Sequence, residues 1–254
     1  LVGSRNPTST GQRAAHDFAA HLAGAGLAIT SGLALGVDGA AHQGALDAGG
    51  ITLAVMGTGP DRIYPARHRD LAHAIVARGA LVTEFPLGTP PLPDHFPRRN
   101  RLISGLSLGT LVVEAALRSG SLITARFALE QGREVFAIPG SIHNPLARGC
   151  HALIRQGAKL VETAQDIAEE LGALSGACAT GPDAQNSHDE PAELSVEYRQ
   201  LLDSMGYDPI SVDELVSRCG LTAKALSSML LLLELQDYVA SSAGGRYVRT
   251  EKRA

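Results

Sequence analysis

The sequence lacks the features that mark membrane, secreted or disulfide-rich proteins. Tryptophan is absent and aromatic residues make up only 4% of the 254 residues, so the core has to be built from aliphatic side chains. Cys150, Cys178 and Cys219 lie far apart and show no zinc-like spacing, which argues against a disulfide framework and predicts no metal site. No run of about 18 apolar residues and no signal peptide is visible, so we expect a cytoplasmic protein without a membrane span.

Charge is unevenly distributed along the chain. The formal net charge of −4 argues, taken alone, against a nucleic-acid partner. Residues 96–156, however, hold 8 basic and 3 acidic residues, whereas residues 157–192 hold 1 basic and 7 acidic residues. Because local patches rather than the mean charge attract polyanions, the basic segment is a candidate binding surface. An uneven surface without function is the alternative at this point.

Up to about residue 172, short apolar runs alternate with amphipathic stretches, which predicts an α/β domain with parallel strands and right-handed crossovers. The expected strands are Leu27–Thr30, Thr52–Val55, Ala80–Thr83, Thr110–Val113, Glu134–Ile138 and Lys159–Val161. The expected helices are Gly11–Ala25, Val37–Ala48, Ala66–Arg78, Arg99–Leu106, Ser121–Gln131, Cys150–Gln156 and Ala164–Leu171. The proline-rich connection 84–97 interrupts this rhythm and is expected to form an ordered lip beside a site.

The remainder of the chain predicts a second, smaller domain. Residues 173–192 are rich in small and polar residues without periodicity, which is typical of a flexible linker. Residues 193–254 predict a helix, a helix–turn–helix and a hairpin, the order of a winged helix, and Ser211 and Thr222 are placed to cap two of the helices. The expected elements are Ala192–Met205, Val212–Cys219, Ala223–Gln236, Tyr238–Ser242 and Arg246–Thr250.

Two glycine-containing turns follow predicted strands near the start of the chain. Gly3-Ser4-Arg5 offers backbone N–H groups and a guanidinium to a phosphate. The segment 31–38, which contains Gly32, matches neither the dinucleotide fingerprint nor the P-loop, so ATP hydrolysis of the P-loop kind is not expected. Asp38 is predicted to cap the following helix, and His42 is predicted to be a helix residue with a local partner rather than a catalytic base.

Two further segments carry polar side chains at predicted strand ends. Phe96-Pro97-Arg98-Arg99-Asn100-Arg101 combines guanidinium forks with an aromatic ring that can stack on a base. Segment 114–124 opens a helix with small residues suited to an anion, and includes Arg118, Ser119, Gly120, Ser121 and Thr124. Glu114 is either a catalytic carboxylate or, as we favour, a structural partner of Arg98 or Arg118. Since no nucleophile–base pair or metal-ligand cluster emerges, we expect neither an enzyme nor a cofactor.

Taken together, these segments resemble the DprA/Smf family of DNA-processing proteins. The matching stretches lie in order between Val2 and Ala158 and read VGSRNPT, SGLALGVDGAAH, GTGPDRIYPARH, HFPRRNRLISGLS, LVVEAALRSGSLITARFALEQGREVFAIPG and RGCHALIRQGA. The resemblance implies an extended Rossmann-like domain over residues 1–172 whose strand-end pocket holds single-stranded DNA, followed by a winged-helix-like module over 193–254. It also implies a homodimer formed through residues Cys150 to Leu171, and a RecA-type recombinase as partner during natural transformation.

The resemblance places phosphate contacts at Arg5, at Arg99 to Arg101 and at Arg118 to Thr124, which agrees with the segments chosen on physical grounds. The candidate DNA-binding residues are Gly3, Ser4, Arg5, Gly32, Phe96, Arg98, Arg99, Asn100, Arg101, Arg118, Ser119, Gly120, Ser121 and Thr124. Two alternatives stay open. One is a nucleotide-binding or nucleoside-monophosphate-cleaving enzyme that uses Glu114. The other is an adaptor whose tail binds proteins, since helix 223–236 offers only Lys224 as a cation.

Overall fold

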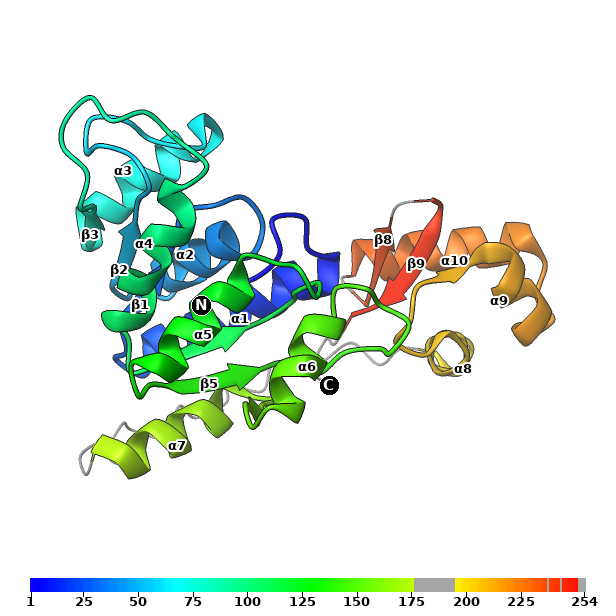
Figure 1. The fold of residues 1–254 in the computed structure, drawn as a ribbon. Coiled ribbons are helices and arrows are strands. Elements are labelled where there is room, and N and C mark those ends of the chain that lie inside the picture. The colour runs from blue at the N-terminus through cyan, green and yellow to red at the C-terminus, as the bar shows by residue number, and fades with distance from the viewer. Residues whose placement is uncertain (176–194, 237, 243, 251–254) are drawn as a thin grey trace. The chain divides into compact units, whose positions relative to one another are not determined.

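A computed structural model of the chain describes residues 1–175, 195–236, 238–242 and 244–250 (Figure 1). These residues fall into two compact units, Leu1–Gly181 and Pro182–Ala254. Residues 176–192 of the predicted linker lie outside the described residues. Residues 173–175 complete helix α7 (Ala164–Ser175), which runs four residues beyond its predicted end.

The first unit is built on a parallel sheet, as the sequence predicts. One run of strands pairs in the order β1 (Ile29–Ser31), β2 (Thr52–Val55), β3 (Ala80–Val82). The other pairs in the order β4 (Gly109–Val112), β5 (Glu134–Ala137), β6 (Lys159–Leu160). Residues 1 and 2 lie between the two runs: the amino group of Leu1 donates to the oxygen of Thr30, and Val2 forms a parallel bridge to Val112. The strand ends of both runs therefore meet beside the turn that follows Val2.

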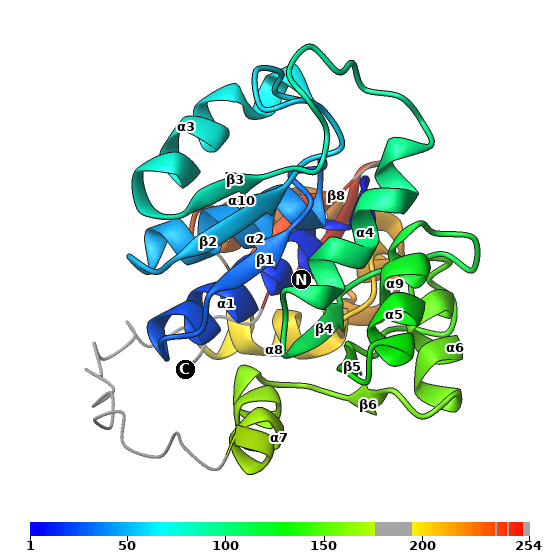
Figure 2. The ribbon, with the colours of Figure 1, turned by 60° about the vertical axis from the view of Figure 1, so that its left-hand side comes forward.

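Helices cover both faces of this sheet (Figure 2). One face packs against α1 (Ser9–Gly24), α2 (Val37–Asp47), α3 (Arg69–Arg78) and α7, with Phe136 of β5 fully buried among them. The other face packs against α4 (His95–Gly105), α5 (Ser121–Glu130) and α6 (Arg148–Arg155). Alanine is frequent in both cores, which lets the helices approach the short strands closely. The expected Rossmann-like α/β layering is confirmed.

Helix α4 begins four residues earlier than predicted, at His95 instead of Arg99. Pro97 does not prevent this, because backbone N–H groups in the first turn of a helix lack intrahelical partners anyway. The predicted helix 66–78 consists of a short 3-10 turn, η1 (Ala66–His68), followed by α3. Strand β1 begins two residues later than predicted, and most other boundaries shift by one or two residues.

The second unit has the helix and strand order of a winged helix. It contains α8 (Val196–Met205), β7 (Ile210–Ser211), α9 (Val212–Cys219), α10 (Ala223–Leu235), β8 (Val239–Ser242) and β9 (Arg246–Arg249). The strands pair antiparallel in the order β7-β9-β8, and β7 is an addition to the prediction. Both predicted caps are confirmed: Ser211 forms a capping box with Glu214, and the Thr222 hydroxyl accepts from the N–H of Ala225.

Within the described ranges, none of the helices taken singly has both the length and the apolar character needed to cross a membrane. Helices α9 and α10 reach that criterion only as a pair, and they are bent by 110° at their break. Leu215, Leu226, Leu230 and Leu233 of this pair are fully buried in the core of the second unit. That core accounts for these four leucines, whereas Leu231, Leu232 and Leu235 of α10 are exposed.

Candidate nucleic-acid interface

A pocket of about 260 Å³ opens where the strand ends meet α4 and the start of α5. Its lining contains most of the predicted site: Gly3, Arg5, Phe96, Arg99, Asn100, Ser119, Gly120, Ser121 and Thr124. Five candidates are not part of the lining: Ser4, Gly32, Arg98, Arg101 and Arg118. Residues from sequence positions 3 to 124 thus converge on one concave surface, as expected at the carboxyl edge of a parallel sheet.

Arg5 and two aromatic rings form a row at this pocket. The Arg5 guanidinium lies 5.7 Å from the centre of the Phe96 ring, and the Phe96 and Tyr64 ring centres lie 5.5 Å apart. Arg5 is exposed, and Tyr64 is 48% exposed. Tyr64 was not among the predicted site residues, because only the fold brings the loop after β2 next to α4. Phe96 is half-buried, and accessible rings beside a cation are suited to stacking nucleobases next to a bound phosphate.

The start of α5 supplies an anion-binding element to the pocket. The hydroxyls of Ser119 and Ser121 lie 2.7 Å apart, and the side-chain amide of Asn100 donates to the oxygen of Gly120 at 3.3 Å. The N–H groups of Leu122 and Ile123 donate to the oxygens of Ser119 and Gly120, and because α5 begins at Ser121 the positive end of its helix dipole is located here. The arrangement favours a phosphate or another anion over a neutral ligand.

Arg99 lines the pocket but is almost wholly buried. It is only 3% exposed, and its Nη1 donates to the oxygen of Gly32 at 2.6 Å and to the oxygen of Val55. Burial lowers the pKa of Arg99 to about 10, while the nearby Asp38 carboxylate acts in the opposite direction. Its Nε has no hydrogen-bond partner among the described residues. Arg99 therefore links the ends of β1 and β2 by hydrogen bonds and places a positive charge at the pocket.

In the glycine-rich segment 31–38, the structure corrects the predicted role of Asp38 and explains the glycine at position 32. Asp38 lies in the first turn of α2 but does not cap it, because the N-cap residue is Gly36. The Asp38 carboxylate instead accepts from the N–H groups of Gly32, at 3.1 Å, and Ala34, at 3.3 Å, and so fixes this loop. A Cβ at Gly32 would collide with Arg99 and Asp38, which explains the glycine. Gly32 thus supports the pocket from outside its lining.

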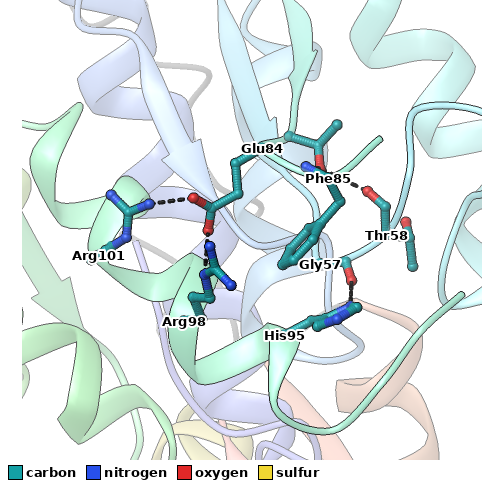
Figure 3. Close-up of polar contacts among 8 residues, drawn as sticks. Gly57, Thr58, Glu84, Phe85, His95, Arg98 and Arg101 are labelled. Carbon is teal, nitrogen blue, oxygen red and sulfur yellow. Dashed lines mark hydrogen bonds and ion pairs between the residues drawn. The ribbon is translucent and has the colours of Figure 1, made fainter. Parts of the chain in front are cut away.

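Arg98 and Arg101 lie on a different face of α4 from the pocket. Both contact the carboxylate of Glu84, which follows β3 (Figure 3). Residues that are three apart on a helix share a face, and this pair is roughly half a turn away from Phe96 and Asn100. The basic segment 96–101 is therefore divided between two sites.

Glu114 is buried outside the pocket lining, where it contacts Thr8. Its two carboxylate oxygens accept from the Thr8 N–H at 2.9 Å and from the Thr8 hydroxyl at 2.6 Å, and the same hydroxyl caps α1. The structural role predicted for Glu114 is confirmed. The predicted partners were wrong, because Arg98 is turned toward Glu84 and Arg118 is exposed.

His42 has the local partner that the sequence predicts. It is fully buried, and its Nδ1 lies 2.6 Å from the hydroxyl of Thr52, which itself donates to the oxygen of Ile29. Nδ1 is therefore the donor. Burial is the main reason that the pKa of His42 falls to about 3, so the imidazole is neutral at physiological pH.

A second hollow of about 530 Å³ lies beside β6 and α7. Its charged residues are Lys159, Asp166, Glu169 and Glu170, so its lining is net negative. Like charges disfavour a polyanion there. Of the two sites, the strand-end pocket is the one suited to nucleic acid.

Comparisons with known proteins match both units. The sequence model of DNA recombination-mediator protein A matches residues 1–172, and that of the DprA winged helix domain matches residues 185–245. Protein Smf of Escherichia coli K12 is 47% identical over 253 residues, which cover 99% of this chain and 67% of Smf. The putative DNA processing protein DprA of Mycobacterium tuberculosis H37Rv is 40% identical, and 63% of its length is covered.

Two solved structures share the fold of the first unit. DNA processing protein A of Streptococcus pneumoniae has a TM-score of 0.63 and 47% identity, covering 66% of this chain and 59% of that one. DNA processing protein A of Helicobacter pylori, described for its unique single-stranded DNA binding mode, has a TM-score of 0.62 and 30% identity, covering 67% of this chain and 77% of that one. The chain belongs to the DprA/Smf family of DNA-processing proteins.

Proposed function

We propose that this chain binds single-stranded DNA, without sequence preference, in the pocket at the strand ends. The observation that carries the proposal is the convergence of Arg5, Asn100 and the start of α5 beside the half-buried ring of Phe96 and the exposed ring of Tyr64. Phosphates would be held by the Arg5 guanidinium and attracted by the positive end of α5, and bases would stack on the rings. Stacking on a ring face does not distinguish one base from another, so such a site is tolerant of sequence.

The strand would extend beyond the pocket. A volume of about 260 Å³ is small for several nucleotides, and exposed arginines lie outside the lining at Arg98, Arg101 and Arg118. These would contact neighbouring phosphates. Ser4 and Gly32 would act through the backbone of their turns, since the Ser4 hydroxyl already accepts from Asn6 and Gly32 holds Arg99.

The similarity to relatives supports this proposal and extends it. The Helicobacter pylori protein is described for binding single-stranded DNA. The chain spans about two thirds of the length of the curated relatives it matches. For the whole protein we propose a cytoplasmic homodimer, formed through the region 150–171, that protects incoming DNA and loads a RecA-type recombinase during transformation.

We propose a binding protein rather than an enzyme. Cleavage of nucleoside monophosphates, the alternative considered above, would need Glu114 at the pocket as the catalytic carboxylate. Both of its oxygens are instead engaged by Thr8, and Glu114 is not among the lining residues. If the protein released free base from nucleoside monophosphates and Glu114→Gln abolished that release, the result would support the enzyme alternative.

Fluorescence anisotropy with a labelled oligo-dT tests the proposal. We expect Arg5→Ala to weaken binding at least about tenfold, because a charge-assisted phosphate contact is lost. Arg126→Ala is the matched control, since Arg126 is an exposed arginine of the same unit that pairs with Glu130 and lies outside the lining. Equal affinity of Arg5→Ala and wild type would reject the pocket as the binding site.

A further inference from the structure

The carboxylate of Glu84 lies between the two arginines on the outer face of α4 (Figure 3). Arg98 Nε is 3.5 Å from Glu84 Oε1, and Arg101 Nη2 contacts Oε2. The Arg98 contact is an ion pair without a hydrogen bond, because Oε1 has no hydrogen-bond partner among the described residues. Arg98 is therefore held more weakly than Arg101.

Exposure differs sharply across this cluster. The Glu84 side chain is 20% exposed, whereas the Arg98 and Arg101 side chains are 66% and 45% exposed. The carboxylate thus sits on the protein side of the two guanidinium groups, which face solvent. A guanidinium has five N–H donors, so one carboxylate cannot satisfy both arginines. Each arginine keeps donors that an external anion can use.

The backbone on either side of Glu84 is fixed by its neighbours. The Thr83 hydroxyl donates to the oxygen of Thr58 at 2.7 Å and accepts from the N–H of Phe85 at 3.1 Å. The Phe85 ring stacks on His95 with ring centres 4.1 Å apart, and Arg98 lies 5.8 Å above the Phe85 ring. These contacts keep the Glu84 carboxylate beside Arg98 and Arg101, where a strand that leaves the pocket would meet the two arginines.

We propose that Glu84 is a built-in competitor of DNA phosphate for Arg98 and Arg101 and thereby limits the affinity of the site. This rests on the proposed function. A strand anchored in the pocket presents its next phosphates at high local concentration, which lets them draw the arginines away from Glu84. The exchange costs the ion pairs already present, so each bound strand is held less tightly and dissociates faster than two free arginines would allow.

The test is an oligo-dT titration of wild type, Glu84→Gln and Glu130→Gln over a range of salt concentrations. Glu130→Gln is the matched control because it removes the same charge from an exposed Arg–Glu pair elsewhere in this unit. We expect Glu84→Gln to lower Kd about twofold to thirtyfold, the range for two exposed ion pairs. Its log–log salt slope should steepen by about 0.7, as for one further phosphate neutralised on a single strand. Glu130→Gln should leave both unchanged.

A double-mutant cycle separates competition from a structural effect of the Glu84→Gln substitution. In an Arg98→Ala/Arg101→Ala background the gain from Glu84→Gln should disappear, because Glu84 would act through those two side chains. The proposal is overturned if Glu84→Gln still lowers Kd in the Arg98→Ala/Arg101→Ala background, or if Glu84→Gln alone leaves Kd unchanged. It is also overturned if Glu84→Gln alone weakens binding, which would mean that Glu84 positions the arginines for DNA. Absence of oligo-dT binding by wild type would reject the proposed function itself, and this proposal with it.

Discussion

Replacing Arg99 with alanine should destabilise the fold around the site rather than remove a DNA contact. Arg99 is almost wholly buried, and its Nη1 serves the carbonyl oxygens of Gly32 and Val55, which terminate neighbouring strands. In Arg99→Ala both oxygens lose this donor, the Asp38 carboxylate loses a nearby cation, and a cavity opens under α4. All three changes destabilise the folded state.

The magnitude follows from these contacts. Two buried acceptors left without this donor cost about 1–3 kcal/mol each. Relief of guanidinium burial, the same effect that lowers the pKa of Arg99 to about 10, offsets part of this cost. We expect a net loss of about 3 kcal/mol, within the range for removing one partner of a buried pair. In a unit of this size that corresponds to a fall in Tm of about 10 °C.

Thermal unfolding followed by circular dichroism measures this effect, with Arg5→Ala as the comparison. Arg5 is exposed, so Arg5→Ala should change Tm by no more than about 1–2 °C while weakening DNA binding. Arg99→Ala with the Tm of wild type and weak DNA binding would refute the reasoning, because Arg99 would then contact the ligand directly.

Two further predictions concern buried groups away from the pocket. Glu114→Ala should lower the free energy of unfolding by about 1–2 kcal/mol in urea titrations, because the cap of α1 loses its support, and should leave oligo-dT affinity unchanged; lost affinity at full stability would contradict this. Burial lowers the pKa of His42 to about 3. Below about pH 6.5 the unfolded chain therefore binds a proton at His42 that the folded protein does not, so the free energy of unfolding falls as the pH drops. His42→Asn should flatten that dependence by up to about 1.4 kcal/mol per pH unit, and an unaltered slope would show that His42 titrates normally.

Local sequence signals were enough to predict most of the fold. Strand Thr52–Val55 and helix Val212–Cys219 match their predicted bounds, because an apolar run between breakers and a capping box both act within a few residues. The bridge from Val2 to β4 and the contact of Leu1 with Thr30 were not predicted, since both depend on the folded sheet. β7 was missed because two residues carry no periodic pattern.

The sequence predicted which residues form most of the candidate site, but not the faces on which they lie or the partners that they contact. The segment 96–101 was identified from its arginines, yet its division between two faces of α4 follows only once the helix is known to start at His95. Tyr64 lies 32 residues before this segment, so only tertiary packing places it there, and the predicted lip 84–97 contains Glu84 but gave no sign of its contacts with Arg98 and Arg101. The partner of Glu114 was wrong for the same reason, because Thr8 is 106 residues away.

A crystal structure of the protein with a short oligo-dT would test the central claim most directly. We expect a backbone phosphate within hydrogen-bond distance of Arg5 and of the Ser119 and Ser121 hydroxyls at the positive end of α5, with a base stacked on Phe96 or Tyr64. A strand bound only to the second unit, or to the first unit away from this pocket, would contradict it.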